Sequence, residues 1–441
     1  MSERWKRTTI AECLAASFAG EWGADPVPGN TVVYRATDID DEGRIVGAGA
    51  ARRLPIGKLT SKMLKTGDIL LEGSGGGPGK PVGRVAYFDS EAHGSPATCS
   101  NFFKTLRPSR DQVDPRFLLQ KLFWFYKQPP ILALQQQTTG IINLKFQEYL
   151  ASQVEIPELV SEQAKIAEIL DTLDTAIHET EALITKLKAV KQGLLHDLLT
   201  RGIDANGELR PPQSEAPHLY RLSPLGWIPT EWVVDSAGSI LAGIDAGWSP
   251  SCPEEPPSEG EWGVLKVSAV SGGAYDARQS KRLPPNLRPI LSIEVRVGDV
   301  LLARANGVAD LVAKTVLVRD TPTKLMLSDK ILRLVPNEKF VRSDYLVRIM
   351  MHAGTRSQIN GMMNGSSGQR NISQSQIRSI IVPIPSIIEQ AASMERLNEL
   401  VGRLEGEMKI LQKRKSLKHA LMDDLLTGRV RVTPLLGAAT A

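Results

Sequence analysis

The segment Glu162–Leu199, EQAKIAEILDTLDTAIHETEALITKLKAVKQGLLHDLL, decides how this chain folds. It contains no proline, and Gly193 is its single glycine. Apolar residues return along it in steps of four and three, the heptad pattern of a helix that packs against another helix. At about 1.5 Å per residue, the segment predicts a helical rod of roughly 57 Å. The positions of the stripe are Ile166, Leu170, Leu173, Ile177, Thr180, Ile184, Leu187, Lys191, Leu194 and Leu198.

A second heptad stripe lies near the end of the chain, in the same register, at Leu397, Leu400, Leu404, Glu407, Leu411, Arg414, Lys418, Leu421 and Leu425. An exposed apolar stripe needs a partner helix, so we expect the two to pair with each other, with polar seam residues such as Thr180 and Lys418 restricting the register. The alternative is two amphipathic helices in separate globular cores. The apolar residues expected to pair are Ile166, Leu170, Leu173, Ile177, Ile184 and Leu187 with Leu397, Leu400, Leu404, Leu411, Leu421 and Leu425.

The whole chain is an internal repeat. Thr66–Leu71 (TGDILL) recurs in the second half of the chain as Val297–Leu302 (VGDVLL), and Trp5 has its counterpart in Trp232. Further matches keep the same order with a slowly drifting offset: Thr139–Leu144 with Ser367–Ile372, Ile156-Pro157 with Ile384-Pro385, Glu162-Gln163 with Glu389-Gln390, and Asp197–Thr200 with Asp424–Thr427. The sequence therefore predicts two copies of one unit.

Each copy has the same plan of short β-type runs, a helix and a long helix. The first of the shorter helices is expected to begin at Asp114-Pro115, an N-cap followed by proline, and its second copy near Ser343. The segment from Gly202 to Leu222 has the glycine and proline content of a linker. The fold class that follows is α+β.

The composition excludes several classes of protein. The chain has 441 residues, 42% of them hydrophobic and 23% charged, with a net charge of +4, which is an ordinary globular composition. Cys13, Cys99 and Cys252 lie too far apart for a CxxC metal site or a disulfide framework. No apolar run has the length of a membrane span or a signal peptide, so a cytoplasmic protein is expected.

The sequence lacks the complete motifs of the catalytic and metal sites considered below. The loop Gly73–Lys80 resembles a phosphate-binding loop, but Pro81 stands where a Mg²⁺-binding hydroxyl is required. The histidines form no HxxxH or HExxH pair, and none has a neighbouring cysteine. The Asn-Pro-Pro-Tyr and Asp-Pro-Pro-Tyr motifs of adenine methyltransferases do not occur. We therefore expect no catalytic residue and no metal ligand.

Several segments in a fixed order resemble the specificity subunits of type I restriction–modification systems. In the first copy they are Ile156–Gln163 (IPELVSEQ), the heptad helix, and Leu194–Gly202 (LLHDLLTRG). The second copy opens with Leu225–Trp232 (LGWIPTEW), which is similar to a domain start in that family. It ends with Val382–Pro385, Glu389-Gln390 and Leu421–Val430.

The resemblance implies two tandem target recognition domains of mixed α/β structure. Long helices that form an antiparallel coiled coil, with pseudo-two-fold symmetry, would separate them. The boundaries expected are target recognition domain 1 at 1–158, helix 1 at 159–203, a linker at 204–222, target recognition domain 2 at 223–386, helix 2 at 387–430 and a tail at 431–441.

The resemblance also implies a function. Each recognition domain would read one half of a split double-stranded DNA target, and the helices would set the spacer between the halves. The helices would dock two methyltransferase subunits, which bind S-adenosylmethionine, and restriction/translocase subunits using ATP and Mg²⁺ would join them. The chain itself would hold no cofactor, contact no membrane and catalyse no reaction.

Base contacts then fall to cationic and amide side chains of the two recognition domains. Arginine can pair with guanine and asparagine with adenine, whereas lysine mostly anchors phosphate. The candidates are Lys80, Arg84, Lys145, Lys266, Arg304, Asn306, Lys314 and Arg370. Two alternatives stay open: a coiled-coil scaffold with no DNA role, and a nucleotide-dependent enzyme that uses the loop Gly73–Lys80.

Overall fold

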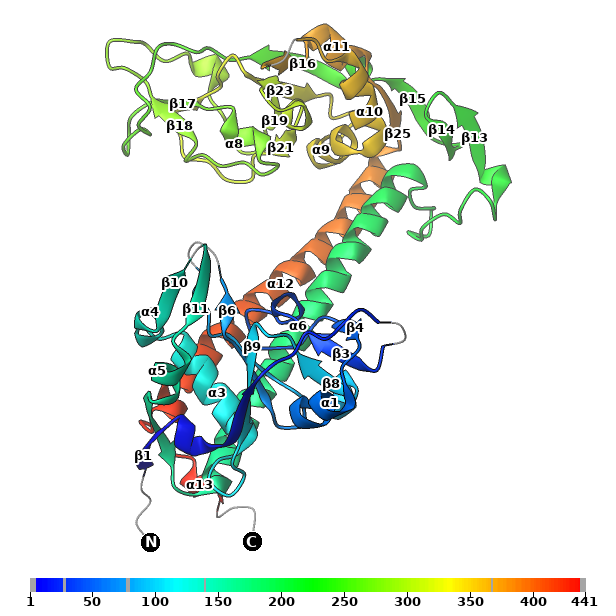
Figure 1. The fold of residues 1–441 in the computed structure, drawn as a ribbon. Coiled ribbons are helices and arrows are strands. Elements are labelled where there is room, and N and C mark those ends of the chain that lie inside the picture. The colour runs from blue at the N-terminus through cyan, green and yellow to red at the C-terminus, as the bar shows by residue number, and fades with distance from the viewer. Residues whose placement is uncertain (1–4, 27–28, 77–79, 139, 366–367, 437–441) are drawn as a thin grey trace. The chain divides into compact units, whose positions relative to one another are not determined.

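The computed structural model of the chain describes residues 5–26, 29–76, 80–138, 140–365 and 368–436 (Figure 1). The chain divides into two compact units, each of which is described by itself. Unit 1 comprises Met1–Leu183 and Met408–Ala441, and unit 2 comprises Ile184–Glu407. Residues 77–79 of the glycine-rich loop, Thr139 and Ser367 of the repeat, and the end of the predicted tail lie outside the described residues.

Unit 1 is built on a four-stranded antiparallel sheet of order β2 (Leu14–Ala19), β9 (Phe103–Pro108), β5 (Ile69–Glu72) and β7 (Val85–Tyr87). Three smaller sheets surround it: β4 (Ala50–Arg52), β3 (Thr31–Tyr34) and β8 (Ala97–Cys99); β10 (Gln135–Thr138), β11 (Ile141–Leu144) and β6 (Ser74–Gly75); and β1 (Trp5–Thr9) with β12 (Gln153–Pro157). Its shorter α-helices are α1 (Ile56–Lys62), α2 (Ser90–His93), α3 (Pro115–Tyr126), α4 (Pro130–Ala133), α5 (Phe146–Leu150) and α13 (Thr433–Leu436).

Unit 2 repeats this topology, which confirms the predicted duplication. Its four-stranded sheet has the order β16 (Leu241–Ala246), β23 (Ile331–Pro336), β19 (Val300–Ala303) and β21 (Thr315–Leu317). The smaller sheets are β18 (Ser280–Arg282), β17 (Gly263–Leu265) and β22 (Leu325–Met326); β20 (Ala305–Asn306) with β24 (Arg370–Asn371); β15 (Val233–Ser236) with β25 (Ile381–Ile384); and β13 (Tyr220–Ser223) with β14 (Gly226–Pro229). The shorter α-helices are α7 (Ala237–Ile240), α8 (Ser268–Ser271), α9 (Ser343–Met351), α10 (Ala353–Met362) and α11 (Gln374–Ser379).

The repeated Gly-Asp runs form the buried central strands β5 and β19. Both strands are fully buried, because alternate side chains enter hydrophobic clusters on opposite faces of the sheet. In β5, Ile69 and Leu71 join the cluster that includes α3 and the long helices, whereas Leu70 joins the cluster under β3 and β8. In β19, likewise, Val300 and Leu302 join one hydrophobic cluster and Leu301 and Ala303 join another.

The predicted helix starts are confirmed. Helix α3 begins at Pro115, and the Asp114 carboxylate accepts hydrogen bonds from the backbone N–H groups of Arg116 and Phe117, both at 2.9 Å. Its counterpart α9 begins at Ser343. An N-cap carboxylate satisfies N–H groups that lack a partner within the helix, so the sequence signal here is local and strong.

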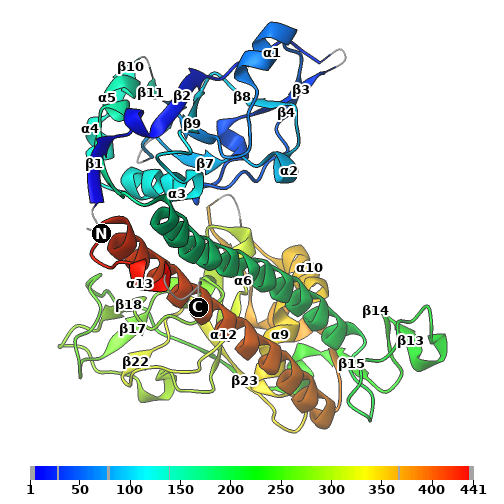
Figure 2. The same ribbon diagram turned by 90° about the horizontal axis from the view of Figure 1, so that it is seen from below.

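The two long helices are α6 (Val160–Thr200) and α12 (Ile387–Leu426), and each contributes one half to each unit. Figures 1 and 2 show them side by side. In unit 1 Asp174 contacts Lys418 while Thr180, further along α6, contacts Arg414, which comes earlier on α12. In unit 2 the last turn of α6 shares a core cluster with Met394, near the start of α12. Both halves are therefore antiparallel, as predicted.

None of the twelve predicted pairing residues is exposed. Eight of them are buried and Leu173, Leu400, Leu411 and Leu421 are half-buried. The polar seam residues of unit 1 find partners across the pair, since Lys418 Nζ lies 2.5 Å from Asp174 Oδ1 and Arg414 donates to the Ala176 carbonyl at 2.8 Å and to Thr180. Polar pairs of this kind fix one register among those that an apolar stripe alone would allow.

The repeated glutamines anchor the starts of the long helices. Gln163 is fully buried; its Oε1 accepts from Asp114 N at 2.8 Å, and its Nε2 donates to the carbonyls of Gln112 and Pro157 at 3.2 and 2.8 Å. Gln390 in unit 2 makes the same three bonds, each of 2.9 Å, with Arg342, Phe340 and Pro385. One amide thus ties the first turn of each long helix to the loop before α3 or α9.

The repeated glutamates pair with arginines that follow the end of the opposite long helix. In unit 1 the Glu162 carboxylate accepts two 2.7 Å bonds from Arg431. In unit 2 the Glu389 carboxylate accepts from Arg210 at 2.5 and 3.2 Å and from Trp232 Nε1 at 3.1 Å. In each unit, therefore, a bidentate and largely buried ion pair joins the start of one long helix to the segment that follows the other.

Arg210 belongs to the segment predicted as a linker, 204–222, and that segment is folded. Ile203 and Leu209 form a β-bridge, and Arg210 is 6% exposed. A 3₁₀ turn at Pro217–Leu219 leads into β13. The prolines and glycines of this segment therefore mark turns within unit 2.

Lys121 of α3 is buried in the core of unit 1. Its Nζ donates to the carbonyl of Leu426 at 2.6 Å and lies 4.9 Å from the ring centroid of Trp124. Burial lowers the pKa of this lysine to about 8, because the charged form loses its hydration. The last carbonyls of α12 compensate for part of this loss, since cations are favoured at the C-terminal end of a helix.

The stability of unit 1 is expected to rise with pH through this lysine. The folded pKa lies below the unfolded one, so the unfolded chain binds more protons between pH 8 and pH 10.5, and unfolding becomes costlier by on the order of 3 kcal/mol across that window. In urea denaturation, the free energy of unfolding of the wild type should therefore rise with pH relative to that of Lys121→Met. The exposed Lys65→Met is the control, and a Lys121→Met difference that is independent of pH would contradict the expectation.

Candidate nucleic-acid interface

A small group of paired strands in each unit carries exposed amide groups, and in unit 2 an exposed guanidinium group as well. In unit 1 it is β10 and β11 with β6, and in unit 2 it is β20 with β24, at the matching place in the repeat. Amides and guanidinium groups are the side chains that can make two hydrogen bonds to one base edge. These two groups of paired strands are therefore the candidate interface. They are called hairpin 1 and hairpin 2 below, although β20 and β24 of hairpin 2 are paired in space and lie far apart in the sequence.

Hairpin 1 presents two free glutamines beside a fixed one. The Gln135 side chain accepts from Val82 N at 2.9 Å and donates to the carbonyls of Val82 and Ile131 at 3.1 and 2.8 Å. The following residues, Gln136 and Gln137, are exposed, and their side chains have no hydrogen-bond partner among the described residues. One amide thus holds the strand and leaves the next two available to a ligand.

Hairpin 2 presents a mixed set. Asn306 lies opposite Arg370 in the strand pair, and the Asn306 Oδ1 accepts from Val308 N at 3.0 Å. Gln369, Arg370 and Asn371 are exposed. The backbone of Arg304 joins the hairpin to the rest of the unit. Its N–H donates to the Lys330 carbonyl at 2.8 Å, and its carbonyl accepts from the Ile372 N–H at 3.0 Å.

The structure brings Arg304, Asn306 and Arg370 together at hairpin 2, but it disperses the other predicted residues. Lys80 is largely exposed and lies 3.2 Å from Asp41. Lys145 pairs with Glu148 at 3.6 Å and Lys266 with Glu254 at 3.1 Å. Lys314 is half-buried after β19.

Arg84 has a structural role in unit 1. Its guanidinium donates to Glu72 at 3.0 and 2.9 Å and to the carbonyls of Ile39 and Ala36, both at 3.1 Å. Glu72 is 2% exposed, and its hydrogen bonds raise the pKa of Arg84. These contacts use the donors that a base contact would need.

Sequence reasoning missed the exposed amides Gln136, Gln137, Gln369 and Asn371. The signal for the first pair was the run of three glutamines, Gln135–Gln137, which two threonines separate from the repeated Gly-Ile-Ile-Asn segment. A run of amides does not reveal which member is exposed, because Gln135 in the same run is committed to backbone groups. The tertiary contacts of Gln135 with Val82 and Ile131 decide it.

Two properties of the described residues bear on metal binding and on membrane contact. They contain no group of three or more histidine, cysteine, aspartate or glutamate side chains that could hold a metal ion. Within the same part of the chain, no helix is both long and apolar enough to cross a membrane.

Comparisons with known proteins show which family this chain is similar to. The family model for the type I restriction modification DNA specificity domain matches residues 25–189. The EcoEI specificity subunit of Escherichia coli is 31% identical over 297 residues, which are 61% of this chain and 49% of that protein. The MjaVIII specificity subunit of Methanocaldococcus jannaschii is 24% identical over 72% of each chain.

A solved structure shares the fold. The type I restriction–modification S subunit from M. genitalium aligns with a TM-score of 0.54 over 96% of both chains, at 16% sequence identity. The match to EcoEI, by contrast, spans about half the length of that relative.

Proposed function

We propose that this chain is a specificity subunit of a type I restriction–modification system, that it reads a split DNA target and that it catalyses no reaction itself. The observation that carries the proposal is the duplicated unit with an amide-bearing hairpin at the same place in each copy. Two similar readers in one chain suit a target with two half-sites. A scaffold without a DNA role leaves these hairpins unexplained.

The partners follow from the family. We assign methylation to two methyltransferase subunits that carry S-adenosylmethionine. DNA translocation and cleavage fall to motor-nuclease subunits that use ATP and Mg²⁺. Such a complex works on chromosomal DNA, which places it in the cytoplasm. The paired helices α6 and α12 supply the surface on which the methyltransferase subunits dock and set the spacer between half-sites.

The proposal is tested by mapping methylated adenines in a host that expresses this chain with its methyltransferase subunit. The wild type is expected to methylate one bipartite sequence. The double variant Asn306→Ala/Arg370→Ala should relax one half-site, because each bidentate base contact is worth about 1–3 kcal/mol of discrimination. The double variant Gln136→Ala/Gln137→Ala should relax the other half-site.

Lys80→Ala is the control for a phosphate contact, which should weaken methylation at all sequences alike. A wild-type complex that methylates without sequence preference would overturn the proposal. Equal relaxation of both half-sites by one double variant would show that the hairpins are not separate readers.

A further inference from the structure

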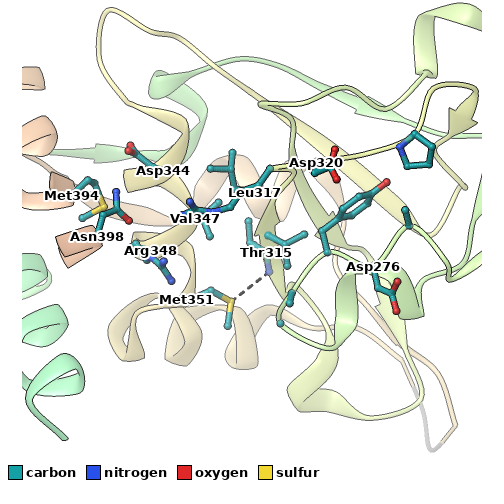
Figure 3. Close-up of a pocket in the computed structure, with 17 residues that line it drawn as sticks. Asp276, Thr315, Leu317, Asp320, Asp344, Val347, Arg348, Met351, Met394 and Asn398 are labelled. Atoms are coloured by element: carbon teal, nitrogen blue, oxygen red, sulfur yellow. Dashed lines mark hydrogen bonds between the residues drawn. The ribbon is translucent and has the colours of Figure 1, made fainter. Parts of the chain in front are cut away.

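Unit 2 contains a cavity that the proposed DNA contacts do not use. It has a volume of about 630 Å³ and lies between α9, β21 and α12 (Figure 3). Met351 and Met394 supply apolar walls. The charged side chains of the lining are Arg319 and Arg348 together with Asp276, Asp320 and Asp344. Figure 3 shows Arg348 on the same side of the cavity as Asn398 of α12.

Unit 1 has a smaller groove, of about 270 Å³, at the matching place between α3, β7 and α6. Counted from the first residue of each helix, Gln120 on α3 aligns with Arg348 on α9. By the same count, Asp171 and Asp174 on α6 align with Asn398 and Val401 on α12. The two grooves are therefore the same feature of the repeat with different side chains.

In unit 1 helical carboxylates satisfy the polar side chains of the groove. Gln120 Nε2 donates to Asp171 Oδ1 at 3.1 Å and to Asp174 Oδ2 at 3.0 Å. Arg116 pairs with Asp171 at 2.9 Å, and Lys418 pairs with Asp174. Every charge of this network has an opposite charge beside it.

In unit 2 the long helix carries neither carboxylate, since Asn398 and Val401 stand at those positions, and Arg348 stands in place of Gln120. Of the aspartates that line the cavity, Asp276 pairs with Arg278 at 2.9 Å. Among the described residues, the Arg348 guanidinium has no hydrogen-bond or ion-pair partner. Asp344, on the same helix, is engaged by Arg342 at 3.0 Å. Burial and the nearby Arg319 lower the pKa of Arg348, and Asp344 offsets only part of this effect, so its charge is incompletely compensated within the chain. An uncompensated, partly buried charge costs stability, which favours a ligand that brings the missing anion.

We propose that this cavity docks an acidic segment of a partner subunit, one carboxylate of which pairs with Arg348. The carboxylates that fill the corresponding place in unit 1 are carried by a protein helix, and the unit 2 cavity is far larger than a lone ion. Methionine walls adapt readily to the side chains of a partner. The identity of the partner, the methyltransferase subunit, rests on the proposed function.

The test compares four forms of the full chain in calorimetric titration with the methyltransferase subunit and in thermal unfolding without it. Arg348→Gln installs the residue of the unit 1 groove and should weaken binding by about tenfold or more. The same variant should raise the Tm of the isolated chain, because it removes an unpaired charge. Arg296→Gln, an exposed arginine outside the cavity, should stay within about twofold of wild type.

Asn398→Asp is the decisive variant. It places a carboxylate beside Arg348, as Asp171 stands beside Gln120, so it should raise the Tm of the isolated chain and weaken partner binding together. A structural arginine would behave differently, since Arg348→Gln would then lower the Tm. Such a fall, or binding of Arg348→Gln within about twofold of wild type, would overturn the inference.

Free glutamate serves as the probe for a small-molecule occupant. If it raises the Tm of the wild type but not of Arg348→Gln, while partner binding is equal in both, the site takes a free carboxylate and partner docking is refuted. A wild-type complex that methylates selectively while Arg348→Gln binds normally overturns this inference alone. A wild type that neither binds the subunit nor methylates overturns the proposed function as well.

Discussion

Glu389→Gln is expected to lower the free energy of unfolding of unit 2 by about 3 kcal/mol, because it leaves a buried arginine without its main counter-ion. Glu389 accepts from Arg210 at 2.5 Å, from Trp232 Nε1 at 3.1 Å and from Ile203 N at 3.0 Å. The remaining partner of Arg210, Glu231, is largely exposed and cannot replace a buried carboxylate. One substitution thus loosens the folded linker, the start of α12 and the end of α6 at once.

The measurement is urea denaturation, with hydrogen exchange of the peptides that span residues 203–232 to localise the effect. Glu395→Gln is the matched control, because Glu395 is exposed on the same helix and has no side-chain partner among the described residues. It should change the stability by no more than about 0.5 kcal/mol. Equal effects of the two variants would mean that the Arg210–Glu389 pair contributes nothing beyond a surface contact.

Lengthening both long helices by one heptad is expected to change the spacer of the DNA target and leave both half-sites unaltered. Repeating Ile177–Leu183 in α6 and Leu404–Ile410 in α12 keeps both stripes in phase. Seven residues add about 10 Å to a helix, and B-DNA advances about 3.4 Å per base pair. The spacer can therefore grow by up to about three base pairs, or by less if the DNA twists to keep both half-sites in reach.

Genome-wide mapping of methylated adenines reads out both the spacer and the half-sites. A two-residue insertion at the same places is the control, since it turns each apolar stripe by about 200° away from its partner. This control should abolish pairing and methylation. Half-site bases that change while the spacer stays constant would refute the division of labour between domains and helices.

The sequence alone determined the features that depend on local pattern. The heptads of α6 and α12, the cap at Asp114 and the buried Gly-Asp strands were all predicted, because the spacing of side chains along one segment decides them. The duplication was predicted as well, since a repeated order of short matches needs no knowledge of contacts. These signals were enough to indicate the family.

Only the tertiary structure decided which polar side chains are committed and which are free. The sequence does not distinguish Arg84 from Arg348. In the structure Arg84 donates hydrogen bonds to Glu72, whereas Arg348 lines a cavity and has no partner among the residues that the structure describes. Arg210 finds Glu389 across 179 residues of chain, and no local pattern records such a pairing. The physical reason is that charge compensation depends on distances in space, whereas helix and strand periodicity depends on distance along the chain.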